Sequence, residues 1–143
     1  MIKECPFCSE IESRSRVISE TQDTMTILSN PTLVQGHYLV VPKRHVEKFS
    51  EMNDEELRDL FSKVINWQEL LLKKNSGCDI RQNYRPFLKQ SRLKVNHLHV
   101  HLIPREFEDE LYGKCQIYER EIFKELNQKE LDETLKELKK LMI

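Results

Sequence analysis

Residues 96–105 read Asn-His-Leu-His-Val-His-Leu-Ile-Pro-Arg, and this stretch decides how the rest of the chain is interpreted. Three histidines alternate here with apolar residues, which is the period of a β-strand whose side chains point to opposite faces. We therefore expect His97, His99 and His101 on one face of a strand and the residues between them in a core. Three imidazoles on a half-buried strand are costly unless the rings bind a metal or take part in a reaction.

The other two of the five histidines, His37 and His45, lie in a second short stretch, Gly-His-Tyr-Leu-Val-Val-Pro-Lys-Arg-His, over residues 36–45. Near the start of the chain, Cys5 and Cys8 form a Cys-x-x-Cys pair. Such a pair is a redox dithiol, half of a zinc site or two buried thiols. The histidines downstream favour zinc, because they supply the two ligands that the pair lacks.

The composition limits the classes of function. The chain has 143 residues, which is typical of one domain, and its formal net charge is −1. A general nucleic-acid binder usually carries a basic excess, so this class is not expected. No apolar run approaches the ~20 residues that span a bilayer, and the first residues lack the apolar segment of a signal peptide. We therefore expect a cytoplasmic protein that binds neither nucleic acid nor membranes, in which the four cysteines are thiols or metal ligands.

Helices and strands are expected along the whole chain. Apolar residues at helical spacing follow Asn53 and Asp54, either of which can cap a helix, and predict a long helix from residue 54 to about residue 75. Its surplus apolar surface, including Trp67, indicates either a thick core helix or a dimer contact, and the dimer contact is favoured. Strands are expected at residues 16–20, 24–29, 37–41 and 78–84, a helical pattern up to about residue 126, and a last helix after Asn127. No linker appears, so one domain, residues 1–143, is predicted, with a helical extension from about residue 106.

The histidine row permits three kinds of function. In the first, the central ring of His99 attacks phosphorus and forms a covalent nucleotidyl-histidine, which water or another acceptor resolves. In the second, the row binds a catalytic transition metal, as in oxygenases or metallohydrolases. In the third, the histidines and Cys5 and Cys8 form only a structural zinc site in a binding module. The spacing of the histidines does not choose among them.

The wider pattern resembles the histidine triad (HIT) superfamily. The run His-φ-His-φ-His-φ-φ, where φ is apolar, follows Gly-His-x-Leu-Val-x-Pro-Lys-x-His, with Cys-x-x-Cys ahead of both and Pro-Arg behind. The resemblance covers residues 5–105. It implies an α+β, HIT-like fold with a mainly antiparallel sheet, one long helix and, in this chain, additional C-terminal helices. It also implies a homodimer that acts on a small nucleotide substrate.

The resemblance further implies a role for each matching residue. The histidines of the reaction are His99 as the nucleophile, His101 at the α-phosphate, His97 in support of the network and His37 in a proton relay. At the ribose the matching position is Ser29 by spacing or Asn30 by chemistry, and near the phosphates it is Asn83. The basic loop before the triad is expected to contact phosphate through Arg92 and Lys94.

Zinc-containing bacterial members of the superfamily hold the ion with residues that match Cys5, Cys8, His45 and His97. Two thiolates and two imidazoles make a closed, structural site. Such a site would join the N-terminus to the triad and restrict His97 in proton transfer. Magnesium bound to the substrate is compatible with this chemistry, although the triad does not require it.

The run before the triad departs from the superfamily pattern Gly-Gln-Ser/Thr-Val-x-His, because Leu93 and Lys94 stand at the glutamine and hydroxyl positions. In phosphoramidase-type members that amide or hydroxyl assists the leaving group, whereas a lysine suits an anionic leaving group. We therefore predict a nucleotide hydrolase, or a nucleotidyl transferase, that cleaves an α-phosphate bond of a substrate such as a dinucleoside polyphosphate. The alternatives are a nucleoside phosphoramidase and a zinc-stabilised nucleotide-binding protein with little turnover.

Overall fold

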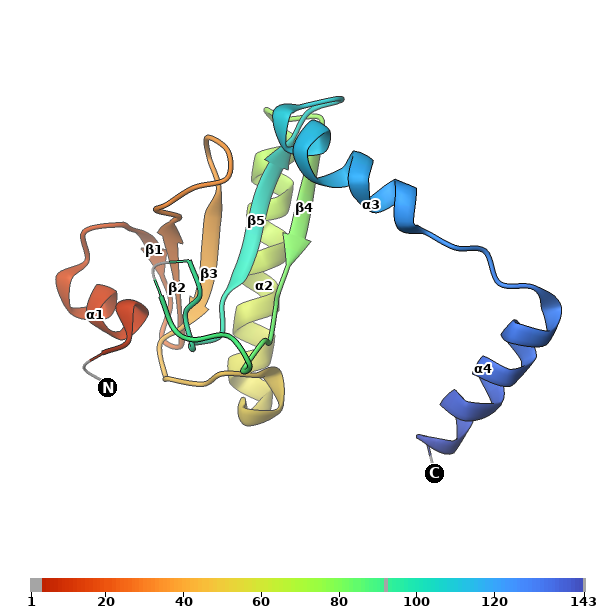
Figure 1. The fold of residues 1–143 in the computed structure, drawn as a ribbon. Coiled ribbons are helices and arrows are strands. Elements are labelled where there is room, and N and C mark those ends of the chain that lie inside the picture. The colour runs from red at the N-terminus through yellow and green to blue at the C-terminus, as the bar shows by residue number, and fades with distance from the viewer. Residues whose placement is uncertain (1–3, 92, 143) are drawn as a thin grey trace. The chain divides into compact units, whose positions relative to one another are not determined.

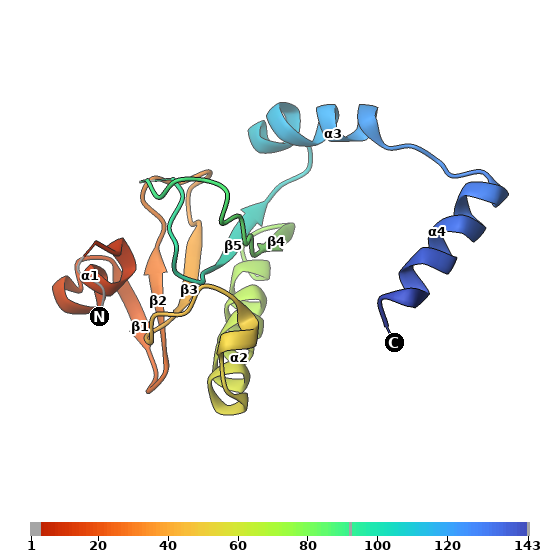
Figure 2. The same cartoon turned by 60° about the horizontal axis from the view of Figure 1, so that its bottom comes forward.

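The computed structural model describes residues 4–91 and 93–142. The chain forms two compact units, Met1–Asp109 and Glu110–Ile143. Figure 1 and Figure 2 show the elements of each unit from two directions. The organisation as one domain with a helical extension stays a prediction.

A five-stranded sheet forms the centre of the first unit. The strands pair in the order β1-β2-β3-β5-β4, and each of these pairs is antiparallel. Their bounds are β1 (Val17–Glu20), β2 (Thr24–Leu28), β3 (Tyr38–Pro42), β4 (Gly77–Arg81) and β5 (Val100–Arg105). The predicted α+β class with an antiparallel sheet is confirmed, and so are the four strands predicted outside the triad, although β4 ends at Arg81 and not at Tyr84.

The long helix α2 (Asp54–Leu72) covers one face of this sheet (Figure 1). It follows a 3₁₀ turn, η1 (Phe49–Glu51), and begins where the sequence predicts. The reason is a capping box, in which Asn53 and Glu56 each accept the other's backbone N–H. The buried cluster between helix and sheet consists of Val40, Val46, Met52, Leu60, Val64, Leu71, Leu98, Val100 and Leu102. The apolar residues between the triad histidines therefore lie in a core, as predicted.

Trp67 packs inside its own chain. Its indole N–H donates to the Thr26 hydroxyl at 2.9 Å, and its ring lies 5.1 Å from the Tyr38 ring. These contacts account for Trp67 within its own chain, and the dimer contact predicted for α2 stays a prediction. The exposed apolar side chains of the helix are instead Phe61, Ile65, Leu70 and Leu72.

A short helix that the sequence did not predict, α1 (Pro6–Ser13), packs against the sheet face that α2 does not cover. Pro6 takes the first helical position, where a missing N–H removes no hydrogen bond, and the Cys5 thiol accepts the Cys8 N–H as a cap. This second cluster contains Cys5, Phe7, Cys8, Met25, Ile27, Leu39 and Val41. Both faces of the sheet are therefore covered near the cysteines.

The triad departs from the prediction, because β5 begins only at Val100. His97 and His99 lie in the segment that leads into the strand, so the three rings do not share one strand face. The register of β3 and β5 would place Leu98 opposite Pro42, which has no N–H to continue the ladder. The Leu98 N–H donates instead to the Val46 carbonyl beyond β3, at 2.6 Å.

The second unit is helical. It contains a π-helical turn, η2 (Tyr112–Gln116), and the helices α3 (Ile117–Ile122) and α4 (Gln128–Lys140). The predicted last helix is confirmed, and Asn127 caps it in a capping box with Glu130. In the described part of the chain, no helix has the length and apolar character that crossing a membrane requires.

Candidate active site and metal centre

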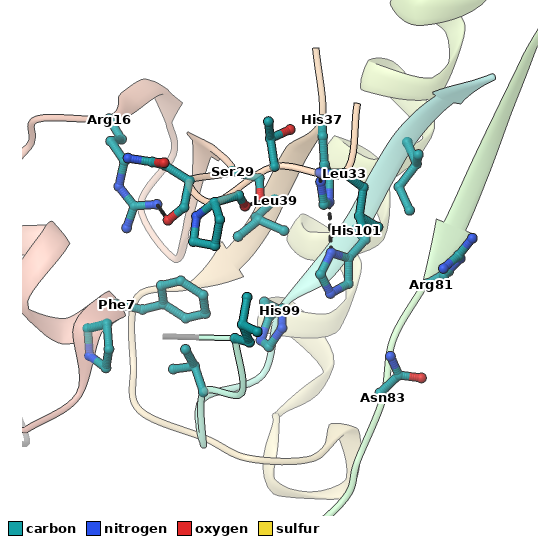
Figure 3. A pocket seen from close by; sticks show the side chains of 17 residues that line it. Phe7, Arg16, Ser29, Leu33, His37, Leu39, Arg81, Asn83, His99 and His101 are labelled. Atoms are coloured by element: carbon teal, nitrogen blue, oxygen red, sulfur yellow. Dashed lines mark hydrogen bonds between the residues drawn. The ribbon is translucent and has the colours of Figure 1, made fainter. Parts of the chain in front are cut away.

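A pocket of about 580 Å³ lies on the sheet face that points away from α2 (Figure 3). Leu39, His101 and Arg81 lie opposite one another across β3, β5 and β4, and all three line the pocket. Directly opposed residues in antiparallel strands present their side chains on one face, so the register itself builds this wall. The volume is within the range of small-molecule sites.

The His99 ring lines the pocket in a single tautomer. Its Nδ1 lies 2.7 Å from the His97 carbonyl oxygen. A carbonyl only accepts, so Nδ1 carries the proton and Nε2 keeps its lone pair. The Phe7 ring packs edge-on at 5.0 Å and holds the imidazole in place (Figure 3). Burial lowers the pKa of His99 below its ordinary value, which favours the neutral form of the ring.

His37 and His101 form an ordered pair beside it. The Leu33 backbone N–H donates to His37 Nδ1 at 3.2 Å, so the proton of that ring is on Nε2. His37 Nε2–H then donates to His101 Nδ1 at 2.8 Å, shown as the dashed line in Figure 3. His101 therefore carries its own proton on Nε2. The Leu33 amide, acting through His37, thus determines that the His101 proton is on Nε2.

Both rings of this pair are held neutral. Burial, helped by the positive charge of neighbouring side chains, lowers the pKa of His37 to about 4 and the pKa of His101 to about 3. At neutral pH the pair is a chain of uncharged imidazoles that ends in an N–H donor. Such a donor suits an oxygen that carries negative charge.

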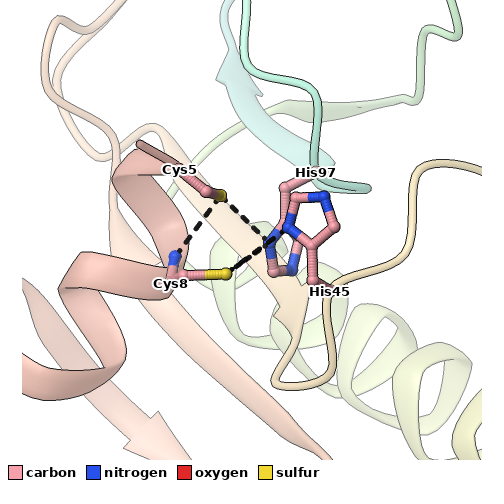
Figure 4. A group of neighbouring side chains, drawn as sticks. All are labelled: Cys5, Cys8, His45 and His97. Carbon is pink, nitrogen blue, oxygen red and sulfur yellow. Dashed lines mark hydrogen bonds between the residues drawn. The ribbon is translucent and has the colours of Figure 1, made fainter. Parts of the chain in front are cut away.

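A second cluster holds four metal-ligating side chains, Cys5, Cys8, His45 and His97 (Figure 4). One donor atom from each lies within 4.8 Å of all the others. The sulfur-to-Nδ1 distances are 3.4 Å from Cys5 to His97, 3.4 Å from Cys8 to His45 and 3.6 Å from Cys8 to His97. A tetrahedral zinc ion at its usual bond lengths separates sulfur and nitrogen ligands by roughly 3.6 Å. The donors therefore fit such an ion.

The tautomer of His97 also fits a ligand. Its Nε2 donates to the Pro42 carbonyl at 2.7 Å, which leaves the Nδ1 lone pair directed at the two sulfurs. Burial lowers the pKa of His97 to about 4 and raises the pKa of the Cys5 thiol to about 11. A bound cation would supply the positive charge that lets these buried thiols ionise. Both nitrogens of His97 are thus engaged away from the pocket.

Only some of the residues predicted to bind the nucleotide are among the described residues that line the pocket. Ser29, Asn30 and Asn83 line the pocket. Lys94 is not among the described lining residues, and its ammonium contacts the Asn96 side-chain oxygen. Arg92 lies outside the described residues.

Arg16 also lines the pocket, although the sequence did not predict it as a site residue. Its Nε lies 3.3 Å from the buried Glu10 carboxylate, and its Nη1 donates to the carbonyls of Leu28 and Asn30. In the sequence it is one basic residue at the start of a strand. The backbone hydrogen bond from Leu28 to Arg16 and the ion pair with Glu10 of α1 bring it to the site. No local signal distinguishes it from a solvated arginine.

The fold and these two clusters define an α+β domain with a histidine-lined pocket, and comparison with known proteins identifies the family. The profile of the HIT domain matches residues 10–108. An uncharacterized HIT-like protein of Methanocaldococcus jannaschii is 36% identical over 138 residues, which cover 94% of this chain and 98% of that protein. The chain belongs to the HIT family.

Two further relatives have names that state an activity. The adenosine 5'-monophosphoramidase of Candida albicans is 30% identical over 112 residues, 73% of this chain and 72% of that protein. The bis(5'-adenosyl)-triphosphatase of Dictyostelium discoideum is 28% identical over 128 residues, 90% of this chain and 84% of that protein.

Solved structures share the fold. A crystal structure of a Streptococcus mutans protein aligns with a TM-score of 0.78 at 26% identity, covering 100% of this chain and 88% of that one. A zinc-bound histidine triad family protein of Mycobacterium smegmatis aligns with a TM-score of 0.64 at 24% identity, covering 76% and 79%. At this identity the second likeness concerns the fold.

Proposed function

We propose that this protein is a nucleotide hydrolase, or a nucleotidyl transferase, in which His99 bonds covalently to the α-phosphorus of its substrate. The observation that carries the proposal is the 2.7 Å hydrogen bond from His99 Nδ1 to the His97 carbonyl, because it leaves Nε2 unprotonated in a ring that lines the pocket. The named activities of the two relatives share an adenosine 5'-phosphoryl group, which supports a nucleotide as substrate.

The reaction has two steps. His99 Nε2 attacks phosphorus, and as the P–N bond forms the bond to the leaving group breaks in line. His101 Nε2–H donates to a phosphoryl oxygen, while His37 keeps that proton on the correct nitrogen. Water then attacks the same phosphorus, frees the imidazole and yields a nucleoside monophosphate. In this proposal Ser29 or Asn30 holds the ribose and Asn83 contacts the phosphates, and all three residues line the pocket.

The metal of the Cys5–Cys8–His45–His97 cluster is proposed to be zinc. Two sulfurs and two imidazole nitrogens make a complete tetrahedral set, with no position left for substrate, so the ion would stabilise the fold. Among the described residues that line the pocket, none is a carboxylate. Any magnesium in the reaction would therefore arrive on the phosphates of the substrate.

Two classes of nucleotide are candidates for the natural substrate. A dinucleoside polyphosphate or similar nucleotide is the first candidate, because Arg81 and Arg16 line the pocket. A phosphoramidate is the second, because one relative is named as a monophosphoramidase. The same attack by His99 serves both, and they differ only in what departs.

A homodimer is proposed on the apolar side chains that α2 and β4 expose. Phe61, Ile65 and Leu70 lie on the helix, and Ile80 lies on the edge strand. Light scattering on the purified protein should give twice the chain mass of 17.2 kDa. A single-chain mass would contradict the dimer without touching the reaction.

The experiment that tests the function is a substrate panel. Diadenosine polyphosphates, adenosine 5'-phosphoramidate and nucleotide sugars are incubated with the zinc-loaded protein, and each product is identified. The proposal predicts AMP from at least one adenylate anhydride or amide, and its loss in His99→Ala. Absence of any nucleoside monophosphate, with or without added phosphate as acceptor, would contradict it.

A further inference from the structure

Arg81 is the last residue of β4 and lies directly opposite His101 in the sheet register. Both side chains line the same pocket. Figure 3 shows Arg81 on the far side of His101 from Phe7 and His99, next to Asn83. Arg81 is thus the neighbour, on the next strand, of the histidine proposed to contact the phosphoryl oxygens, at the end of the pocket away from α1.

The positive charge of Arg81 is poorly neutralised by its neighbours. Its nearest carboxylate, Asp79, is 3.5 Å from Nη2, and the same Asp79 oxygen lies only 2.5 Å from Arg105. Arg105 is nine-tenths buried and forms the shorter ion pair with that carboxylate. The other arginine of the pocket, Arg16, is paired with its own buried carboxylate, Glu10. Most of the Arg81 donors therefore stay available to a ligand.

We propose that Arg81 binds the phosphate of the leaving group and so gives the enzyme a preference for substrates in which the α-phosphate is joined to further phosphates. This inference rests on the proposed function and deepens it. A guanidinium recognises two phosphate oxygens at once through a planar pair of N–H donors. Asn83, two residues further along the same segment, adds an amide at the same end of the pocket.

The same residue works against an amine leaving group. When a phosphoramidate is cleaved, the nitrogen takes up a proton from water and leaves as a neutral amine with the electron pair of the P–N bond. A fixed positive charge beside the nitrogen disfavours the protonated form from which it leaves. Leu93, which also lines the pocket, has no hydrogen-bonding group to offer that nitrogen. When an anhydride is cleaved, the bridging oxygen keeps the electron pair of the P–O bond, and Arg81 stabilises the negative charge that the departing phosphate gains.

The test compares Arg81→Ala with Arg58→Ala, which removes an exposed arginine of α2 outside this pocket. For each protein, kcat/KM is measured on diadenosine tetraphosphate and on adenosine 5'-phosphoramidate, which share the adenylate and differ in the leaving group. Loss of one charge-assisted contact predicts a fall of roughly 10- to 100-fold on the tetraphosphate for Arg81→Ala. The phosphoramidate rate should stay unchanged or rise, and Arg58→Ala should match the parent on both.

Two results would overturn the inference. One is an equal fall on both substrates for Arg81→Ala, which would mean a general effect on the pocket. The other comes from calorimetric titration of inorganic pyrophosphate into the His99→Ala protein, in which added Arg81→Ala should weaken binding by a similar factor. Unchanged pyrophosphate affinity would exclude Arg81 as a phosphate ligand. Cleavage of neither substrate by the parent protein would instead contradict the proposed function, and the pyrophosphate titration would still decide the role of Arg81.

Discussion

His97 and His99 are two residues apart in the sequence, and a backbone carbonyl fixes the tautomer of each, yet on opposite nitrogens. The Pro42 carbonyl binds Nε2 of His97 and leaves Nδ1 to the sulfurs of Cys5 and Cys8. The His97 carbonyl binds Nδ1 of His99 and leaves Nε2 in the pocket. The first lone pair is placed for a metal, and the second for an electrophile.

This difference shows that the role of a histidine follows from the partner of its other nitrogen and not from its place in an alternating row. It also shows how the two clusters are joined. His97, which would hold the metal, supplies the carbonyl that orients His99, the proposed nucleophile. The metal cluster is therefore expected to control stability, and the pocket cluster to control the rate, with His97 as the physical link.

The largest effect is expected from His99→Ala. Removing a covalent nucleophile should lower kcat by on the order of 10⁴-fold or more. The metal content and the melting temperature should change little, because His99 is not a member of the Cys5–Cys8–His45–His97 cluster. The measurement is a steady-state assay together with elemental analysis and a thermal melt. Substantial residual hydrolysis would rule out covalent chemistry at this residue.

Cys8→Ser tests the metal cluster in the same way as His99→Ala tests the pocket cluster. It removes a buried member of the proposed metal cluster, so the protein should lose the proposed zinc and several kcal/mol of unfolding free energy. Cys115→Ser, at an exposed cysteine, is the matched control and should change neither. Zinc content and urea unfolding measure both variants. A Cys8→Ser protein with unchanged zinc and unchanged stability would show that the cluster is not a metal site.

His37→Ala tests the relay between the pocket rings. Without the 2.8 Å hydrogen bond, the His101 proton is free to move to Nδ1, and the pocket loses an oriented donor. We expect kcat to fall by about 10- to 100-fold with KM nearly constant. His37→Gln keeps an N–H donor and should recover part of the rate. Equal rates for the two variants and the parent would contradict the relay.

The pH profile is expected to show the smallest effect. An imidazole with the ordinary pKa of about 6.5 would lose roughly tenfold in its neutral fraction between pH 7.5 and 5.5. Burial lowers the pKa of His99, so the acid limb of kcat/KM should lie below pH 6.5 and the loss should be smaller. An acid limb at or above pH 6.5 would show that the nucleophile is not desolvated.

Stability should also depend on pH, with a definite sign. The pKa of His37 is lowered to about 4, so between that value and about 6.5 the unfolded chain binds more protons than the folded one. The stabilisation of the folded state that comes from the lowered pKa of His37 is therefore complete above about pH 6.5 and is lost as the pH falls toward 4. Urea unfolding at several pH values measures this directly.

Much of the fold was predictable because local signals were strong. The capping residues Asn53 and Asn127 and the period-two pattern of residues 37–41 each specify an element without help from distant residues. Helix α1 was missed because its start depends on Pro6 and a thiol cap, and its remaining residues give a weak apolar pattern. The start of β5 was placed too early because the limit is set by Pro42 on another strand.

The site was predictable in its residue types and less so in its geometry. The alternating histidines and the resemblance to the superfamily predicted the histidines and cysteines that form the two clusters. The Leu33 amide that orders His37 and His101 has no sequence signal, since any residue with an N–H supplies it. Lys94 has the right charge but is not among the described lining residues, because a position in an irregular loop does not fix where a long side chain points.

The most direct test of the account is to look for the bond between His99 and phosphorus. The protein is mixed with diadenosine tetraphosphate for a few milliseconds, quenched in base to preserve the phosphoramidate, digested and analysed by mass spectrometry. The account predicts an adenylyl group on the peptide that contains His99, which forms and decays at rates consistent with kcat and is absent from His99→Ala. Full turnover without this adduct, or an adenylyl group on a different histidine, would contradict it.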